Sequence, residues 1–452
     1  MTAGKNGFAP AKAHCFVDSR VYFFYIPRTF YRTCLPQKGM ELIMKVDAMR
    51  RIDYYVGVPL CFVGTLLYKT GRWFIKPGKA SPRRVLFIEL SEMGSAVLVD
   101  PAMRKLRRET GAELHFAIFK KNKPSLDLLK TVPDENIYTF RDNGLVPLMW
   151  DALRFFFWTR RRKIDAVIDL ELFSRVTALL TGFSGAPAKV GFHAFFNEGL
   201  YRGGFLTHRV AYNPHIHIAA NFVALVHALM AQKEETPYSK TRVSAEDLVL
   251  AKAAVSVREK EDVLAIIREC CAGFDPQKDK IILINPNASE LLIQRRWPPA
   301  HYVRLMQMIL EKCPKAQILI TGDPGEREEA DQLKKQVGAD RCVNFAGKVR
   351  FAQLPALYTV SEFMVTNDSG PGHFAAVTDL PTFVLFGPET PALYGSLGNT
   401  TPIYAGLACS PCVSASNHRK TACRDNVCLQ VIQPEQVFTA IAPHLERVNA
   451  QV

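Results

Sequence analysis

Short runs of apolar residues recur along most of the chain, and polar stretches separate them. Residues 85–88, 166–170 and 281–284 are three such runs. A continuous apolar run of this length is typical of a strand buried on both faces of a parallel sheet. Segments with helical spacing, among them 97–108 and 299–312, alternate with the runs. This alternation predicts βαβ units and an α/β fold with parallel sheets.

The alternation occurs in two blocks, separated by helical segments around 219–231 and 244–272. A chain of 452 residues is too long for one ordinary hydrophobic core. We therefore expect two Rossmann-like domains with a ligand-binding cleft between them. The expected organisation is an N-terminal extension over 1–80, a first domain over 81–235, a helical linker over 236–275 and a second domain over 276–452.

The expected extension contains an apolar segment, residues 54–68, that is shorter than the roughly twenty residues needed to span a bilayer. Basic residues flank it on both sides, which favours a membrane-associated segment lying in the interface of an anionic membrane. A buried core helix and a tilted membrane span are the alternatives. Gly57, Pro59 and Gly64 count against a continuous helix. Residues 1–40 lack the ordered regions of a signal peptide.

The net charge of +14 indicates an anionic partner, for which nucleotide phosphates, anionic lipid and nucleic acid are the candidates. No zinc-finger, RNP or basic-zipper pattern occurs, so no nucleic-acid partner is expected. The apolar and charged fractions, 48% and 22%, are those of a globular protein. An aromatic and basic segment, residues 153–163, is compatible with a second membrane-facing patch, an acceptor-binding surface or a helix with its aromatic side chains packed inward.

The candidate chemistry gathers in the stretch VTNDSGPGHF, residues 365–374. It predicts a strand that ends in a polar turn, after which a helix begins. Ligands bind in the crevice at the carboxyl ends of such strands, and the free N–H groups of a helix N-terminus suit a phosphate. Asp368 and His373 flank this turn.

Four stretches, in order, resemble glycosyltransferase family 9, the lipopolysaccharide heptosyltransferases and their relatives. The resemblance covers residues 84–430, and it implies a GT-B fold and inverting, metal-independent glycosyl transfer. The implied donor is a nucleotide-activated sugar, with ADP-heptose first, and the implied acceptor is an envelope glycolipid at the cytoplasmic face of the inner membrane. On this basis the first domain would bind the acceptor and the second the donor. The stretches are VLFIELSEMGSAVLVDPAMRKLRR, INPNASELLIQRRWPPAHYVRLM, ILITGDPGEREEADQLKK and VTNDSGPGHFAAVTDLPTFVLFGPETPALYGSLG.

The resemblance also assigns roles at the donor site. It places the Asp368 carboxylate at the sugar and the glycine-rich backbone at the pyrophosphate. Glu326 would hold the ribose, because a carboxylate accepts hydrogen bonds from two hydroxyls. Arg295 or Arg296 would neutralise the leaving diphosphate. The full donor-binding set is Asp368, Ser369, Gly370, His373, Glu326, Arg295, Arg296, Asn285 and Ser289.

The chain departs from the family at the catalytic base. Family members usually have Asp in the first loop, where this chain has Ser95. A serine hydroxyl does not act as a base without a partner. Glu92 is the favoured substitute and Glu89 the second candidate. If neither acts, the protein would be a non-catalytic, membrane-associated binding protein for nucleotide sugars; a transferase for another sugar or acceptor is the remaining alternative.

Four cysteines cluster near the C-terminus, within residues 409–428. Their density and the C-x-x-C spacing are typical of a structural Zn or Fe site. A tetrathiolate metal site is the first expectation, paired disulfides the second and free thiols the third. No catalytic metal is expected from the resemblance. The predicted ligands are Cys409, Cys412, Cys423 and Cys428.

Overall fold

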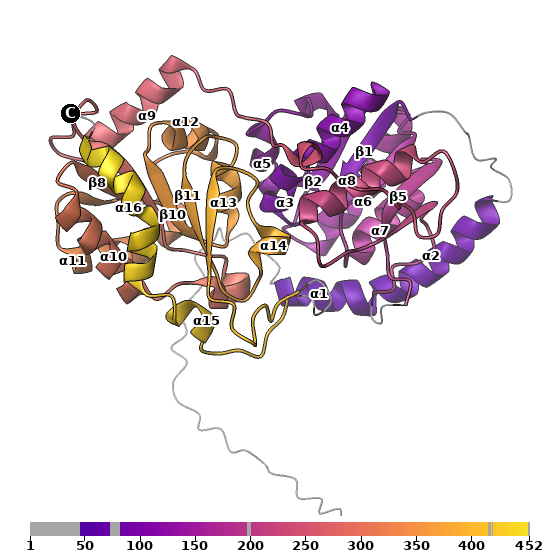
Figure 1. Ribbon diagram of the computed structural model, residues 1–452. Helices are drawn as coiled ribbons and strands as arrows, with labels where there is room; N and C mark the ends of the chain where they lie inside the picture. Colours follow the sequence, from indigo (N-terminus) through magenta and orange to yellow (C-terminus); the bar gives the residue numbers. More distant parts are fainter. Residues whose placement is uncertain (1–45, 73–81, 197–199, 415–416, 418, 451–452) are drawn as a thin grey trace, which may run out of the picture. The chain divides into compact units, whose positions relative to one another are not determined.

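The computed structural model describes residues 46–72, 82–196, 200–414, 417 and 419–450 (Figure 1). Residues 1–40, on which the signal-peptide prediction was made, lie outside the described residues.

The first domain contains a parallel six-stranded sheet with the strand order β3-β2-β1-β4-β5-β6. Its central strand, β1, pairs with β2 on one side and β4 on the other. The strands are β1 (Arg84–Ile88), β2 (Glu113–Phe119), β3 (Ile137–Phe140), β4 (Ala166–Asp169), β5 (Ala188–His193) and β6 (His208–Ala211).

Helices cover both faces of this sheet, because alternate residues of β1 are buried in opposite directions. Val85 and Phe87 pack with α4 and α8, whereas Leu86 and Ile88 pack with α6 and α7. The helices are α3 (Met93–Leu98), α4 (Asp100–Thr110), α5 (Pro124–Asp127), α6 (Leu145–Arg161), α7 (Arg175–Phe183) and α8 (Ile218–Met230).

The second domain repeats this topology in the order β12-β11-β10-β7-β8-β9, again with every pairing parallel. Both sheets therefore have the strand order of a Rossmann fold. The strands are β7 (Lys280–Asn285), β8 (Ala316–Ile320), β9 (Cys342–Asn344), β10 (Phe363–Asn367), β11 (Thr382–Phe386) and β12 (Thr400–Tyr404). The predicted class, α/β with two Rossmann-like domains, is confirmed.

Helix α9 (Val257–Cys270) follows the first domain and packs into the core of the second, where Val263 and Ile267 meet Ile281 and Leu283. A short 3-10 helix, Glu290–Arg295, precedes α10. The remaining helices are α10 (Pro299–Lys312), α11 (Arg327–Val337), α12 (Leu354–Thr359), α13 (Gly370–Ala375), α14 (Pro391–Tyr394), α15 (Val427–Gln430) and α16 (Pro434–Ala450).

The apolar segment of the predicted extension is helical and packs on the first domain. It forms α2 (Gly57–Arg72), which follows α1 (Val46–Tyr55) and lies against α7. The Asp53 carboxylate accepts hydrogen bonds from the backbone N–H groups of Arg175 (2.8 Å) and Val176 (3.2 Å), so it caps the first turn of α7.

The expectation that Gly57, Pro59 and Gly64 interrupt this helix is wrong. Gly57 is the first residue of α2 and Pro59 lies in its first turn, where a missing N–H costs nothing. Gly64 packs against an aromatic ring: a Cβ there would lie 3.1 Å from Phe205 Cζ. The glycines therefore allow close packing on the first domain. One face of α2 is buried and the other is exposed. Within the described ranges, every helix is too short or too polar to span a bilayer.

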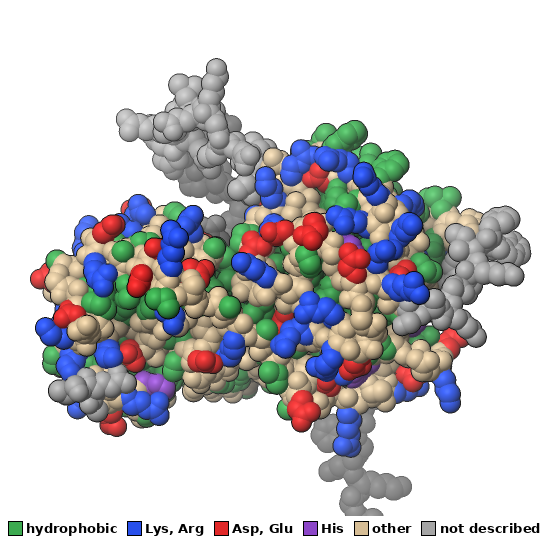
Figure 2. Space-filling view, turned by 90° about the horizontal axis from the view of Figure 1, so that it is seen from above, with side chains coloured by type: hydrophobic (Ala, Val, Ile, Leu, Met, Phe, Trp, Pro, Cys, Tyr) green, Lys and Arg blue, Asp and Glu red, His purple; other side chains and the backbone are tan. Residues whose placement is uncertain are grey.

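Helix α6 buries only part of the aromatic set of residues 153–163. Phe155 is buried against Tyr138 and Phe140, at ring distances of 5.3 Å and 5.4 Å. Phe157, by contrast, is 76% exposed. The helix therefore packs some aromatic side chains inward and presents others to the surface. On the face seen in Figure 2, Lys and Arg side chains lie throughout the surface, in keeping with the net charge of +14.

The packing of α2 predicts that replacing a glycine by alanine lowers the free energy of unfolding at the start of the helix but not at its end. A Cβ on Gly57 would lie 2.7 Å from Arg175 Cβ, whereas nothing lies within 4 Å of one on Gly71. Gly57→Ala should lower the free energy of unfolding by about 1–3 kcal/mol because the helix must move away from α7. The control Gly71→Ala should leave it unchanged or raise it by up to about 1 kcal/mol. Denaturant titration of both variants measures this, and equal effects would contradict the packing.

Candidate active site

The Asn367 side chain organises the donor-side turn. Asn367 is the last residue of β10. Its Oδ1 accepts hydrogen bonds from the backbone N–H of Trp297 (3.1 Å) and from the Tyr302 hydroxyl (3.0 Å). Its Nδ2 donates to the Pro286 carbonyl at 2.7 Å. One buried amide therefore joins the end of β10, the loop after β7 and the start of α10. These ties bring Arg295 to Asp368.

Five ionisable side chains, alternately acidic and basic, form a chain at this site. Asp368 Oδ2 lies 3.8 Å from Arg295 Nε, and Arg295 Nη2 lies 3.1 Å from Glu389 Oε2. Arg419 continues the chain: its Nε lies 3.5 Å from Glu389 Oε1, and its Nη1 contacts Glu92 Oε1. The guanidinium of Arg419 also lies over the Tyr394 ring, 4.7 Å from its centroid. Glu92 belongs to the first domain and the other four charged residues to the second.

Burial controls the ionisation of Asp368. Desolvation is the largest effect and, together with the negative charge of Glu389, it outweighs Arg295 and raises the pKa of Asp368 to about 8. Asp368 is therefore mostly protonated at neutral pH. The hydrogen-bonding interaction of the Asp368 carboxyl with Glu389 also raises the pKa of Asp368.

His373 lies where the two domains touch. A Cβ on Gly94 would lie 2.6 Å from His373 Cδ2, so the absence of a side chain at Gly94 lets α3 approach α13. His373 Nδ1 is 3.2 Å from Ser396 Oγ. Burial, followed by the nearby His217 and Arg295, lowers the pKa of His373 to about 4, so the imidazole is neutral at neutral pH.

The two candidate bases on the first-domain loop differ in charge. Glu92 accepts a hydrogen bond from Ser95 Oγ at 2.9 Å and contacts Arg419. Burial alone would raise the pKa of Glu92, but Arg419, Ser95 and Arg295 together outweigh burial and lower it. Burial raises the pKa of Glu89 well above its ordinary range, and the neighbouring Glu171 raises it further. The Glu92 carboxyl is therefore ionised, whereas the surroundings of Glu89 favour the protonated form of its carboxyl.

Arg295 and Arg296, left as alternatives by the sequence, point to different partners. Arg295 joins the charge chain, whereas Arg296 donates to the Ala288 carbonyl at 3.1 Å and 3.2 Å and lies 3.3 Å from Glu329. The structure thus brings Arg295, and not Arg296, to Asp368.

The other predicted donor residues lie around the same strand ends. Glu326 is half-buried, and its Oε2 accepts a hydrogen bond from the Asp323 N–H at 2.7 Å, which caps a 3-10 turn. Burial is the main effect that raises the pKa of Glu326. Asn285 Nδ2 donates to the Thr321 carbonyl and hydroxyl, both at 3.2 Å, and so holds β7 to β8. Ser289 is exposed on the loop after β7. Ser369 and Gly370 form the N-terminus of α13.

Three site residues were not predicted: Glu389, Arg419 and Glu171. Glu389 lies in the turn after β11 and Asp368 in the turn after β10, so the position of Glu389 after an apolar strand was a usable signal. Glu171 follows β4, and its Oε1 accepts from Ser91 Oγ at 2.8 Å. Arg419 lies within the cysteine-rich segment, far along the chain from Glu92, and no local pattern marks it.

The cysteine-rich segment fastens onto the loop after β11. The backbone N–H groups of Cys412 and Val413 donate to the Pro388 carbonyl, both at 3.0 Å. Cys428 is buried; desolvation and then the neighbouring cysteines raise the pKa of its thiol to about 11. None of these four cysteines forms a disulfide bond in the structure. No group of three or more His, Cys, Asp or Glu side chains in the described part of the chain is arranged to hold a metal ion. The metal site remains a prediction.

The family model described as glycosyltransferase family 9 (heptosyltransferase) matches residues 154–422, more than half of the chain. The chain belongs to this family. Its sequence is 23% identical to the lipopolysaccharide heptosyltransferase 2 of Salmonella typhimurium over 220 residues, which are 48% of this chain and 58% of the relative. It is also 23% identical to the lipopolysaccharide heptosyltransferase 1 of Campylobacter coli over 324 residues, which cover 67% of this chain and 84% of that protein.

Solved structures of family 9 proteins share the fold. The ADP-heptose lipopolysaccharide heptosyltransferase II of E. coli has a TM-score of 0.62 at 20% identity and is covered completely by 81% of this chain. The family 9 glycosyltransferase of Veillonella parvula has a TM-score of 0.60 at 18% identity, with 81% of this chain covering 97% of it. The GT-B fold expected from the resemblance is therefore confirmed.

The raised pKa of Asp368 predicts a pH-dependent contribution to the stability of this family 9 protein. Its folded-state pKa lies above the unfolded value, so the stability it contributes is complete below its ordinary pKa of 3.8 and is lost as the pH rises through about 8. Asp368→Asn keeps the neutral form. The stability of the wild type relative to this variant should therefore fall with rising pH, by at most about 1.4 kcal/mol per pH unit.

Denaturant titrations of both proteins at several pH values in that window measure this difference. A difference that does not change with pH would show that Asp368 is ionised throughout.

Proposed function

We propose that this protein transfers heptose from ADP-heptose, with inversion and without a catalytic metal, to a hydroxyl group of an envelope glycolipid such as the lipopolysaccharide core. The observation that carries the proposal is the ionised Glu92 carboxylate of the first domain, which meets the buried charge chain of the second domain. A base on one side and a cationic site for a leaving diphosphate on the other are the two parts that such a transfer needs.

In this mechanism Glu92 removes the proton from the acceptor hydroxyl. The freed oxygen forms a bond to the anomeric carbon on the face opposite the diphosphate, and the bond from that carbon to the phosphate oxygen breaks. The electron pair leaves with the nucleoside diphosphate, whose charge Arg295 stabilises. Glu92 is engaged by Ser95 through one oxygen and by Arg419 through the other. Because an ionised carboxylate offers about four acceptor positions, it retains capacity for the acceptor hydroxyl.

The donor would lie over the ends of β7 and β10. Asp368 and Glu389 would face the sugar, the backbone of Ser369 and Gly370 the diphosphate, and Glu326 the ribose. His373, being neutral, can donate or accept a hydrogen bond there without adding charge. Asn285, Ser289 and Arg296 would support the walls of this pocket.

A non-catalytic role as a nucleotide-sugar-binding protein is the second candidate, because Ser95 replaces the usual carboxylate. The contact between Ser95 and Glu92 argues against it, since Ser95 orients a carboxylate that is already ionised. A different sugar or acceptor would keep the same catalytic groups.

The base assignment predicts a sharp difference between two neighbouring glutamates. Glu92→Gln should lower turnover by roughly 10²–10⁴-fold, because proton removal is lost. Donor affinity measured by calorimetry should stay the same. Glu89→Gln is the matched control; it should lower turnover far less, since burial and the neighbouring Glu171 raise the pKa of Glu89 and so favour its protonated form. Ser95→Asp should partly restore activity to Glu92→Gln. Normal turnover by Glu92→Gln would remove Glu92 as the base.

We further propose that the protein binds peripherally to the anionic cytoplasmic face of the inner membrane through α2 and α6. Both helices pack against α7, and each exposes an apolar stripe. Basic residues lie beside the stripes, and such a surface suits the interface of an anionic bilayer. The exposed stripe residues are Leu60, Phe62, Val63, Leu66 and Leu67 on α2, and Val146, Met149, Trp150, Leu153 and Phe157 on α6.

Charge placed in these stripes should weaken membrane binding. Leu67→Glu and Phe157→Glu together should shift the protein from vesicles containing anionic lipid to the supernatant in a sedimentation assay. Val257→Glu is the control, because Val257 is as exposed but lies at the start of α9. Release of the control to the same extent, or retention of the double variant, would contradict the proposed surface.

A structural zinc or iron ion held by Cys409, Cys412, Cys423 and Cys428 is also part of the proposal. Such an ion would stabilise the segment that carries Arg419.

A further inference from the structure

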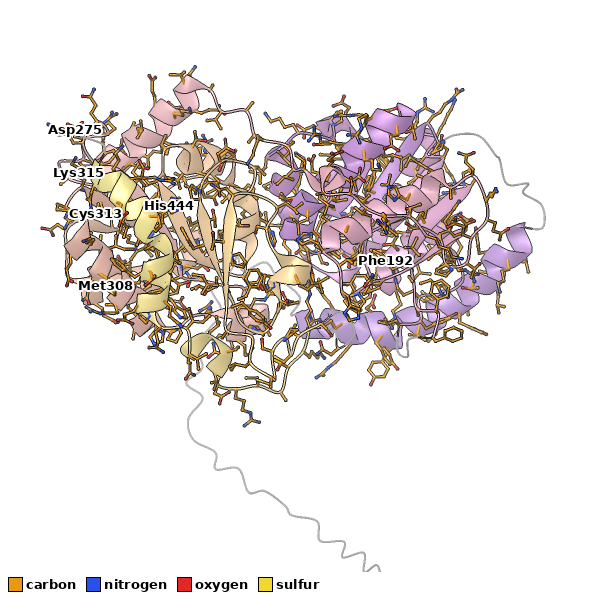
Figure 3. All side chains as sticks on the ribbon, viewed as in Figure 1. Phe192, Asp275, Met308, Cys313, Lys315 and His444 are labelled. Carbon is orange, nitrogen blue, oxygen red and sulfur yellow. The ribbon has the colours of Figure 1, made fainter. Side chains whose placement is uncertain are left out.

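A cavity of about 440 Å³ lies in the first domain, between α2, α7 and the segment that follows β5. This volume is within the range of about 300–1,000 Å³ found for ligand pockets. Its walls are mainly apolar. The apolar lining includes Phe62 and Leu66 from α2, Phe192 from β5 (labelled in Figure 3), and Phe195, Phe205 and Leu206 from the loop between β5 and β6.

The cavity is continuous with the exposed stripe of α2. Phe62 and Leu66 line it, yet their side chains are 58% and 52% exposed. The same two side chains therefore belong to the wall of the cavity and to the surface that we propose faces the membrane.

The charged groups inside the cavity are already neutralised. Asp169 and Arg202 form a buried ion pair. The Arg202 guanidinium also donates to the Ser174 carbonyl (2.9 Å) and the Thr177 hydroxyl (2.8 Å). Burial lowers the pKa of His193, which is therefore neutral. An interior whose charged groups are paired favours a hydrocarbon over a sugar or a phosphate.

The rim carries one free cation. Lys69 lines the cavity from the last part of α2, and no carboxylate in the described ranges pairs with it. The aliphatic part of the Lys69 side chain lies against the loop between β5 and β6, where a Cβ on Gly204 would be 3.8 Å from Lys69 Cε. An apolar interior with a single basic rim residue matches a molecule with a hydrocarbon chain and an anionic head.

The cavity also lies on the same sheet edge as the proposed base. Its floor is formed where β4 and β5 end, and Glu92 follows the end of β1, so all three positions are at the carboxyl edge of one parallel sheet. Arg202 contacts the Glu171 carbonyl, and the Glu171 carboxylate accepts from the Leu90 N–H (3.2 Å) and Ser91 Oγ (2.8 Å). These hydrogen bonds connect the cavity residue Arg202 to Ser91, which is the neighbour of Glu92 in the sequence.

We propose that the cavity binds a hydrocarbon chain of the lipid-anchored acceptor, with the anionic head of the lipid at Lys69. The proposal rests on the proposed function for the identity of the ligand, and it deepens that function by adding a lipid subsite. The bound chain would hold the acceptor on the first domain while its glycan extends along the carboxyl edge of the sheet to Glu92.

The direct test is equilibrium dialysis of the full chain against radiolabelled palmitate below its critical micelle concentration. Wild type should bind saturably, with one palmitate per chain. Ala194→Trp fills the cavity from its loop wall and should weaken binding at least about tenfold. Ala245→Trp, at an exposed position outside the cavity, is the matched control and should bind as wild type does. Absence of saturable binding by wild type, or equal binding by Ala194→Trp, would overturn the proposal.

Lys69→Gln provides a second variant, which inserts no large side chain into the cavity. It should weaken palmitate binding severalfold and leave hexadecanol binding unchanged, because only the anionic head is affected. Equal loss for both probes, or no loss for either, would remove Lys69 from the site.

A transfer assay separates this proposal from the proposed function. The ratio of the KM for a lipid-bearing acceptor to that for its delipidated form should rise for Ala194→Trp and stay unchanged for Ala245→Trp. An unchanged ratio in Ala194→Trp would overturn the lipid subsite while leaving the transferase intact. Absence of transfer to either acceptor, together with palmitate binding that Ala194→Trp abolishes, would overturn the transferase and leave the cavity as a lipid site.

Discussion

The candidate active site depends on the mutual neutralisation of buried charges. Asp368, Glu389 and Glu92 are removed from most of the solvent, and two guanidinium groups lie between them. An isolated buried carboxylate is too costly to remain ionised, so each must either find a cation or take up a proton. The structure uses both solutions: Glu92 is ionised beside Arg419, and Asp368 retains a proton. The chemistry proposed for the site follows from this division.

This charge chain is held in place by uncharged ties. The Asn367 amide joins three segments of the second domain and thereby fixes Arg295 relative to Asp368. Gly94 and His373 set the approach of α3 to α13 through direct contact. His217 adds a further tie between the domains through its Nε2, which lies 2.6 Å from the Gly395 carbonyl oxygen. Small and neutral groups thus determine where the large charged ones meet.

The fold and the donor side of the site could be predicted from the sequence because their signals are local. Buried parallel strands appear as apolar runs, and Asp368 comes three residues after such a run, which ends at Val365. Glu389 has the same signal and was overlooked. Arg419 could not be found in this way, since it reaches Glu92 only through the folding of the cysteine-rich segment onto the loop after β11. The choice between Arg295 and Arg296 likewise depended on side-chain direction, which adjacent positions in a sequence do not reveal.

The contact between Arg419 and Glu92 makes the proton affinity of a first-domain residue depend on the second domain. Arg419 is the principal group that lowers the pKa of Glu92, and it opposes burial. If the domains moved apart, Glu92 would lose this cation together with part of its burial, and its pKa would return toward the ordinary value of a glutamate. The acid–base properties of the candidate base are thus set only while the donor-binding domain lies beside it.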